Sequence, residues 1–202
     1  MPNCSGACAA ATPSAGKGFI FRGGDTWHFG NSAASPYTGG AFDGFSNNGW
    51  KGTSGSPIYI GVDANWYTGT SWARPIFTGD NPISPGINSY VASCPYQTAG
   101  DGGTMVDFSG GDGYIIFDNF ELTGMCQTTT NDQAYVGMNQ PIGGLQFLNL
   151  YMHGWSHLAF HDSSDPVSCG SPGICFAMWG FRGSAGGTPL PVFKNIVIDG
   201  SD

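Results

Sequence analysis

The chain repeats one arrangement of apolar and polar positions three times, as FDNFELTG at 117–124, FLNLYMHG at 147–154 and FKNIVIDG at 193–200. Apolar residues occupy the first, fourth and sixth places of each copy. Successive side chains of a strand point to opposite faces, so the apolar places are predicted to share a buried face while the fifth and seventh places point outward. The closing Gly permits the positive φ of a sharp turn. Each copy therefore predicts a short strand that ends in a turn.

The spacing of the copies predicts that these strands are stacked. The copies begin at positions 117, 147 and 193, that is 30 and then 46 residues apart, and a unit repeated at tens of residues is typical of a solenoid. Asn recurs at the third place as Asn119, Asn149 and Asn195. Asn side chains stacked at a bend are expected to bond to one another and to turn backbone. The alternative is a β-sandwich, whose strands also alternate apolar and polar residues.

The first third of the chain predicts further strands. GKGFIFRGGDTWHFG (16–30) has the pattern of two strands around a Gly-Gly-Asp turn, GTSGSPIYIGVDANW (52–66) predicts a third strand, and ARPIFTGDNP (73–82) a short fourth one. Composition agrees, because the chain has 34 Gly and 13 Pro with 14% aromatic and only 10% charged residues. Such a chain favours many short strands joined by tight turns over long helices.

Three of these motifs, GGDTW (23–27), SGSPIYIG (54–61) and RPIFTG (74–79), resemble the opening rungs of right-handed parallel β-helix proteins of the pectate-lyase-like type. The Phe-x-Asn units resemble the later rungs of that group, and the resemblance covers most of 17–202. It implies an all-β, right-handed parallel β-helix with long loops. We expect a single domain over 1–202, with N-terminal rungs at about 17–80 and later rungs at about 104–202. Few rungs and no C-terminal cap predict a partial solenoid.

The net charge of −8 restricts the partners. No basic patch is present to contact phosphates, which argues against nucleic acid and against anionic membrane surfaces. No apolar run approaches the ~20 residues that cross a bilayer. We therefore expect neither nucleic acid nor membrane among the partners.

Six cysteines include two close pairs, CSGAC (4–8) and CGSPGIC (169–175). An even count with this spacing predicts three disulfides in an oxidising compartment, and we prefer the pairing 4–8, 94–126 and 169–175 among the 15 that six cysteines allow. A metal site is the alternative, although no CxxC motif is present. The protein is thus expected to be secreted. No signal peptide precedes Cys4, so we expect a leader that was removed or a longer parent chain.

The resemblance implies a polysaccharide as partner, and a lyase or a glycoside hydrolase if the protein is an enzyme. The Asn-Thr-Asp, Gly-His-Gly and Arg-Ile-Lys motifs of the polygalacturonase-like branch are absent, and no motif supports Ca²⁺ or another cofactor. The outward places of the repeat nevertheless put Glu121, His153 and Asp199 on neighbouring rungs, together with Tyr151. We predict the first three as catalytic acid–base groups. A solvated face without a function is the alternative.

Other candidates extend this surface. Trp155 and Arg182, with Tyr151, are predicted to bind substrate, because aromatic rings stack on sugars and a cation pairs with a uronate. His153, His157 and His161 have a four-residue spacing that would suit a metal on a helix, but the neighbouring strand pattern favours turns. A non-catalytic glycan-binding or adhesin-like module is the second functional hypothesis.

A structural, self-assembling solenoid is the third hypothesis. FKNIVIDG is the last strand pattern of the sequence, and an unpaired strand edge recruits another strand. We therefore expect a homo-oligomer or a stack through this C-terminal rung.

Overall fold

The computed structural model describes residues 13–28, 49–83, 91, 93, 95, 104–108, 111–127, 133–138, 140–157, 178–183 and 187–199. These residues form an all-β structure of fifteen strands, with no helix among them. The strands are β1 (Gly18–Gly23), β2 (Thr26–His28), β3 (Ile58–Tyr67), β4 (Ile76–Thr78), β5 (Thr104–Phe108), β6 (Ile115–Asp118), β7 (Glu121–Thr123), β8 (Cys126–Gln127), β9 (Gln133–Met138), β10 (Gln146–Leu148), β11 (Tyr151–Met152), β12 (Ser156–His157), β13 (Met178–Gly183), β14 (Val192–Lys194) and β15 (Val197–Ile198).

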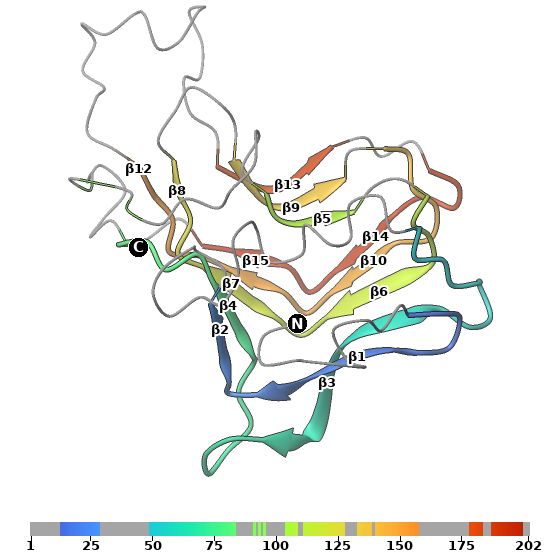
Figure 1. The fold of residues 1–202 in the computed structure, drawn as a ribbon, viewed down its shortest axis with the longest axis horizontal. Coiled ribbons are helices and arrows are strands. Elements are labelled where there is room, and N and C mark those ends of the chain that lie inside the picture. The colour runs from blue at the N-terminus through green and yellow to red at the C-terminus, as the bar shows by residue number, and fades with distance from the viewer. Residues whose placement is uncertain are drawn as a thin grey trace, which may run out of the picture.

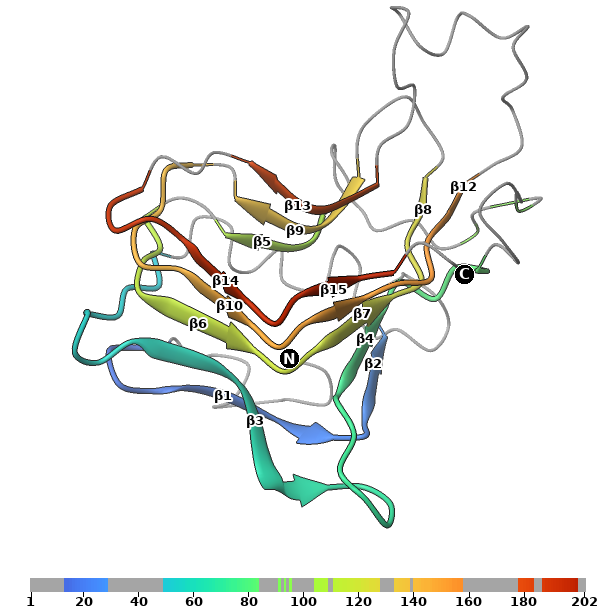
Figure 2. The same ribbon diagram turned by 180° about the vertical axis from the view of Figure 1, so that it is seen from behind.

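All of the paired strands are parallel, and most belong to three sheets (Figure 1). Sheet A has the order β1-β3-β6-β10-β14, sheet B the order β15-β11-β7-β4-β2, and sheet C the order β13-β9-β5. Strands β8 and β12 form a further parallel pair. Sheets A and B meet at an angle like the arms of a V, and sheet C lies across its opening (Figure 2).

The chain passes through the sheets in a constant order. Each strand of sheet A is followed by one of sheet B, as β1–β2, β3–β4, β6–β7, β10–β11 and β14–β15, and we call these five pairs rungs 1 to 5. The strands of sheet C lie in the connections that lead from rungs 2, 3 and 4 to the next rung. This repeated passage through parallel sheets in one order is compatible with the predicted β-solenoid.

The apolar places of the repeat form the core, as predicted. Phe117 of rung 3 is fully buried and aligns with Phe147 of rung 4, which is 1% exposed. Phe193 of rung 5 stacks on Phe147 with ring centroids 5.3 Å apart, yet it is 46% exposed because β14 is the last strand of sheet A. The first place of the repeat is therefore a Phe in each copy, but that Phe is fully buried only where another rung covers it.

The corner between sheets A and B is formed by the predicted Asn residues. Asn119, Asn149 and Asn195 have φ values of 65°, 54° and 55°, in the left-handed region that Asn tolerates better than most residues. Asn195 Nδ2 donates to Asn149 Oδ1 at 2.8 Å, which confirms the ladder between these two rungs. Asn149 Nδ2 instead donates to Asp118 Oδ1 at 2.8 Å, and Asn119 Nδ2 donates to the same oxygen at 3.0 Å.

Asp118 thus takes the place of the next Asn as acceptor in the ladder of Asn side chains, and it also accepts a hydrogen bond from rung 2. Tyr59 Oη donates to Asp118 Oδ2 at 2.9 Å. Burial, this hydrogen bond and the charge of the carboxylate raise the pKa of Tyr59 to about 12. The outer side of the corner is therefore held by one carboxylate that accepts from three side chains.

The GGDTW turn of rung 1 is built around Asp25. Gly24 has a φ of 74°, a backbone conformation that is strained for residues with a side chain. Asp25 Oδ2 accepts a hydrogen bond from Arg22 Nε at 2.8 Å. Asp25 Oδ1 accepts from the hydroxyl of Thr68, beyond the end of β3. Burial raises the pKa of Asp25, but the hydrogen bonds from Arg22 and Thr68 and the Arg22 charge outweigh it, so the pKa is lowered. The turn thereby joins the first two rungs.

Sheet C was not predicted from the sequence, although it supplies much of the core. Met105, Phe108, Tyr135 and Val136 are buried in its strands. Cys126 is buried and disulfide-bonded. The remaining five cysteines lie outside the described residues, so their predicted pairing stays a prediction.

Two substitutions at the same place of the repeat test the stacked core. Phe117→Ala should lower the free energy of unfolding by ~3–5 kcal/mol, because it leaves a cavity among buried rings. Phe193→Ala, the matched control in the end rung, should cost only ~1–2 kcal/mol, because about half of its surface is already exposed. Urea unfolding at low protein concentration measures both values. Equal losses of unfolding free energy in the two variants would contradict the placement of Phe117 inside the stack and of Phe193 at its end.

Candidate functional site

The parallel register arranges the outward places of sheet B into two columns. One column aligns the fifth places of the rungs, and the other aligns the seventh places. The fifth-place column consists of Thr26, Ile76, Glu121, Tyr151 and Val197. The seventh-place column consists of His28, Thr78, Thr123, His153 and Asp199. Together these columns are the outer face of sheet B.

Glu121 and His153 form a hydrogen-bonded pair on this face. His153 Nε2 lies 2.9 Å from Glu121 Oε1, and the two side chains are 17% and 25% exposed. The backbone of His153 is held on both sides, because its N–H donates to Leu122 O at 3.0 Å and its carbonyl accepts from the hydroxyl of Tyr135. The imidazole is therefore fixed in position and remains partly open to solvent.

Tyr151 joins this pair to Asp199. The Tyr151 and His153 rings are stacked, with centroids 4.4 Å apart and planes at 15°. Tyr151 Oη donates to Asp199 Oδ2 at 3.2 Å. All three predicted acid–base residues and Tyr151 thus lie together in one group, which we call the Tyr151 cluster: Glu121, Tyr151, His153 and Asp199.

Thr123 is buried, against the prediction that seventh places point outward. The segment after β4 crosses this end of sheet B, where Asn81 N donates to Gly124 O at 3.0 Å and Ser156 Oγ donates to Pro82 O at 2.6 Å. A Cβ on Gly154 would meet Thr123 Oγ1 and lie 3.0 Å from Ile83 Cδ1. The side chain of Thr123 is therefore enclosed between rungs 3 and 4.

The other two predicted substrate-binding residues are not placed in the Tyr151 cluster. Trp155 is half-buried and packs against the core, with its ring 6.1 Å from that of Tyr135. Arg182 belongs to β13 of sheet C, where its backbone pairs with Gly137, and its side chain lies outside the described residues. The structure thus places Trp155 mainly as a packing residue.

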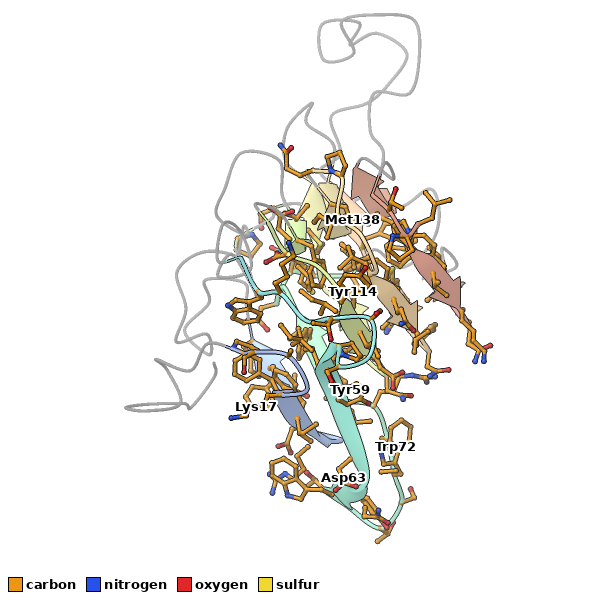
Figure 3. The ribbon with its side chains drawn as sticks, turned by 90° about the vertical axis from the view of Figure 1, so that its right-hand side faces the viewer. Lys17, Tyr59, Asp63, Trp72, Tyr114 and Met138 are labelled. Carbon is orange, nitrogen blue, oxygen red and sulfur yellow. The ribbon has the colours of Figure 1, made fainter. Side chains whose placement is uncertain are left out.

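The remaining tryptophans and tyrosines occupy different environments. Trp50 is buried in the core, whereas Trp66 and Tyr67 are 50% and 39% exposed at the end of β3. This end of β3 and the loop after it project from the stack, as the positions of Asp63 and Trp72 show (Figure 3). The exposed rings are thus on a projection, apart from the Tyr151 cluster.

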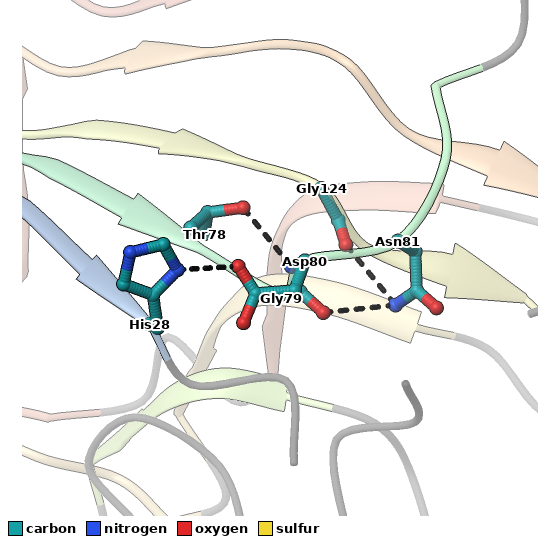
Figure 4. A network of polar contacts seen from close by, with 6 residues as sticks. All are labelled: His28, Thr78, Gly79, Asp80, Asn81 and Gly124. Atoms are coloured by element: carbon teal, nitrogen blue, oxygen red, sulfur yellow. Dashed lines mark hydrogen bonds and ion pairs between the residues drawn. The ribbon is translucent and has the colours of Figure 1, made fainter. Parts of the chain in front are cut away.

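A second His–carboxylate pair lies on rungs 1 and 2, and the sequence analysis missed it (Figure 4). His28 Nδ1 is 2.6 Å from Asp80 Oδ1, and the side chains are 36% and 11% exposed. Aligning GDTWHFG with the FELTG part of the repeat would have placed His28 in the column of His153. No local spacing would have revealed Asp80, which is 52 residues away in the sequence.

The spacing of these side chains decides whether they could hold a metal ion. Calcium takes six to eight oxygen ligands, and among the described residues no three His, Cys, Asp or Glu side chains come together as ligands. The Tyr151 cluster therefore does not fit such an ion. His161 and the side chain of His157 lie outside the described residues. Within the same part of the chain, no helix is long and apolar enough to cross a membrane.

The arrangement offers hydrogen-bond acceptors, an aromatic ring and an imidazole that can exchange protons. Histidine changes charge near neutral pH, and a carboxylate partner selects which ring nitrogen carries the proton.

No protein-family model, curated protein or solved structure matches this chain.

The two histidines should carry their protons on different nitrogens in the neutral form. A carboxylate accepts, so His153 should be protonated at Nε2 and His28 at Nδ1. Long-range ¹H–¹⁵N correlation spectra distinguish these tautomers. Glu121→Gln should remove the preference of His153 and leave that of His28, and Asp80→Asn should do the reverse. The same tautomer at both residues would contradict the two geometries.

Proposed function

We propose that the protein is a right-handed parallel β-helix that binds polysaccharide through the outer face of sheet B. The observation that carries this proposal is the Tyr151 cluster. Its aromatic ring is on rung 4, and its two carboxylates are on the rungs to either side, Glu121 on rung 3 and Asp199 on rung 5. Aromatic rings stack on the apolar faces of sugars, and fixed acceptors bind their hydroxyl groups. The disulfide of Cys126 supports an extracellular location, where such polymers occur.

The charges favour neutral or amino-bearing sugars over uronides. Glu121 and Asp199 in the cluster are both acidic, and like charges would repel a uronate. Two of the described arginines are engaged elsewhere, since Arg22 pairs with Asp25 and Arg74 Nε donates to Asn149 O at 3.1 Å. The side chain of Arg182 lies outside the described residues, so its uronate-binding role stays a prediction.

Of the two enzyme classes that the resemblance implies, the cluster suits a hydrolase better than a lyase. A lyase must also neutralise the carboxylate of a uronate, and the cluster contains neither Lys nor Arg to do so. A glycoside hydrolase uses a pair of carboxyl groups, and the cluster supplies Glu121 and Asp199.

Binding of three uncleaved hexasaccharides tests this proposal. Isothermal titration should show that glucosamine and N-acetylglucosamine hexamers bind and that galacturonate hexamer does not. Tyr151→Ala should weaken binding about tenfold, that is by about 1.4 kcal/mol, because it removes the apolar ring surface that a sugar would cover. Tyr67→Ala, which removes an exposed ring from the projecting end of β3, is the matched control and should have little effect.

The same mixtures are assayed for new reducing ends. Cleavage that Glu121→Gln abolishes would assign acid–base action to the Glu121–His153 pair, whereas binding without cleavage would define a glycan-binding module. Absence of binding to all three hexamers, or equal effects of Tyr151→Ala and Tyr67→Ala, would refute the proposal.

A second candidate function is self-assembly through rung 5. Five of the nine exposed large apolar residues of the described chain belong to this end of the stack: Val192, Phe193, Val197 and Ile198 lie on the last strands of sheets A and B, and Leu190 precedes β14. An open parallel edge next to exposed core residues recruits another strand. A second copy of this chain presents the same edge and the same apolar residues, and we propose it as the occupant.

Val197→Lys should weaken this association by at least about tenfold, because a desolvated charge in the contact is costly. Val197 is outward and 53% exposed, so the substitution spares the core. Sedimentation equilibrium of the wild type and the variant measures the effect. Ser54→Lys, in an exposed turn, is the control for added charge. A wild type that remains monomeric at high concentration would contradict self-assembly.

A further inference from the structure

His28 and Asp80 form a built pair outside the Tyr151 cluster. Asp80 has φ 61°, and its N–H donates to Thr78 Oγ1 at 3.0 Å. The next residue, Asn81, is buried and donates from Nδ2 to the carbonyls of Gly79 and Gly124, each at 3.1 Å (Figure 4). These bonds fix the turn that carries Asp80 against rung 3. The carboxylate is therefore held in place before any ligand arrives.

This turn directs the second nitrogen of His28 away from the carboxylate. Nδ1 is occupied by Asp80 at 2.6 Å, and Nε2 has no partner in the part of the chain that the structure describes. With the proton on Nδ1, Nε2 is an acceptor. A half-exposed acceptor beside a carboxylate binds hydroxyl or ammonium groups and not carboxylates. The chemistry matches that of the Tyr151 cluster.

The two places lie along one face of the stack. His28 is on rung 1 and His153 on rung 4, so their backbones are three rung steps, about 14 Å, apart. The half-buried side chains of Ile76 and Thr78 lie between them on rung 2. This separation is too large for both pairs to act on one glycosidic bond. A linear polymer that runs along the stack over the fifth places, Ile76 and Glu121, passes beside the enclosed Thr123 and would contact both pairs.

We propose that His28 and Asp80 form a distal subsite for the same neutral or amino-bearing polysaccharide chain that the Tyr151 cluster binds. The proposal rests on the proposed function. A chain long enough to reach both places gains the second contact without a second loss of translational freedom, so its affinity rises with length. Short oligomers bind at the Tyr151 cluster alone.

A matrix of two oligomer lengths and two variants tests the subsite. Isothermal titration is carried out with glucosamine dimer and hexamer on the wild type, Asp80→Asn and Tyr151→Ala. Asn tolerates the left-handed backbone of residue 80, so Asp80→Asn is expected to keep the turn, and its melting temperature checks this. Asp80→Asn should weaken hexamer binding about tenfold and leave dimer binding unchanged. Tyr151→Ala should weaken both.

Each remaining outcome has one meaning for the subsite. Hexamer binding that is unaffected by Asp80→Asn, or affected no more than dimer binding, would overturn the distal subsite while leaving binding at Tyr151 intact. Perturbation of the His28 ring resonances by hexamer but not by dimer would support it independently. If only N-acetylglucosamine hexamer binds, the same matrix is carried out with N-acetylglucosamine oligomers, and failure of the wild type to bind any of the three hexamers would refute the proposed function itself.

Discussion

The parallel main-chain hydrogen bonds between rungs are the constraint on which the rest of the structure depends. In sheet B, for example, Tyr151 N donates to Phe120 O at 3.0 Å and Val197 N donates to Leu150 O at 2.9 Å. A slip of one residue would exchange every inward and outward side chain. The buried phenylalanines and the outward acids are therefore consequences of the same register.

The corner of Asn residues makes this register compatible with a change of direction. A left-handed Asn at the same place of rungs 3, 4 and 5 bends sheet A into sheet B without breaking the ladder of backbone bonds. Asp118 replaces one Asn side chain as the acceptor, which places a carboxylate where three donors converge. The corner is thus both a backbone device and a polar network on the outside of the core.

The outer face of sheet B shows how a regular stack can carry irregular chemistry. Every rung contributes one side chain to each column, so acids, histidines and an aromatic ring come within reach of one another at a fixed spacing. Two His–carboxylate pairs on this face differ in the nitrogen that is bonded: Nε2 in His153 and Nδ1 in His28. The same residue types are therefore set up to present different atoms to a ligand.

The sequence by itself determined the features that depend on local alternation. The apolar places, the closing Gly residues and the Asn at each bend predicted stacked strands, and aligning the copies put Glu121, Tyr151, His153 and Asp199 on outward places. Their hydrogen bonds and ring stacking could not be predicted, because they depend on side-chain rotamers across different rungs.

Only the tertiary structure decided the remaining features. Sheet C has no repeated motif, so its buried strands were not recognised. Thr123 is enclosed because the segment after β4 crosses sheet B, although its place in the repeat is outward. Asp80 meets His28 across 52 residues of sequence. These contacts arise where loops of unequal length return to the stack, and the path of a loop is set by packing against distant rungs rather than by its own alternation.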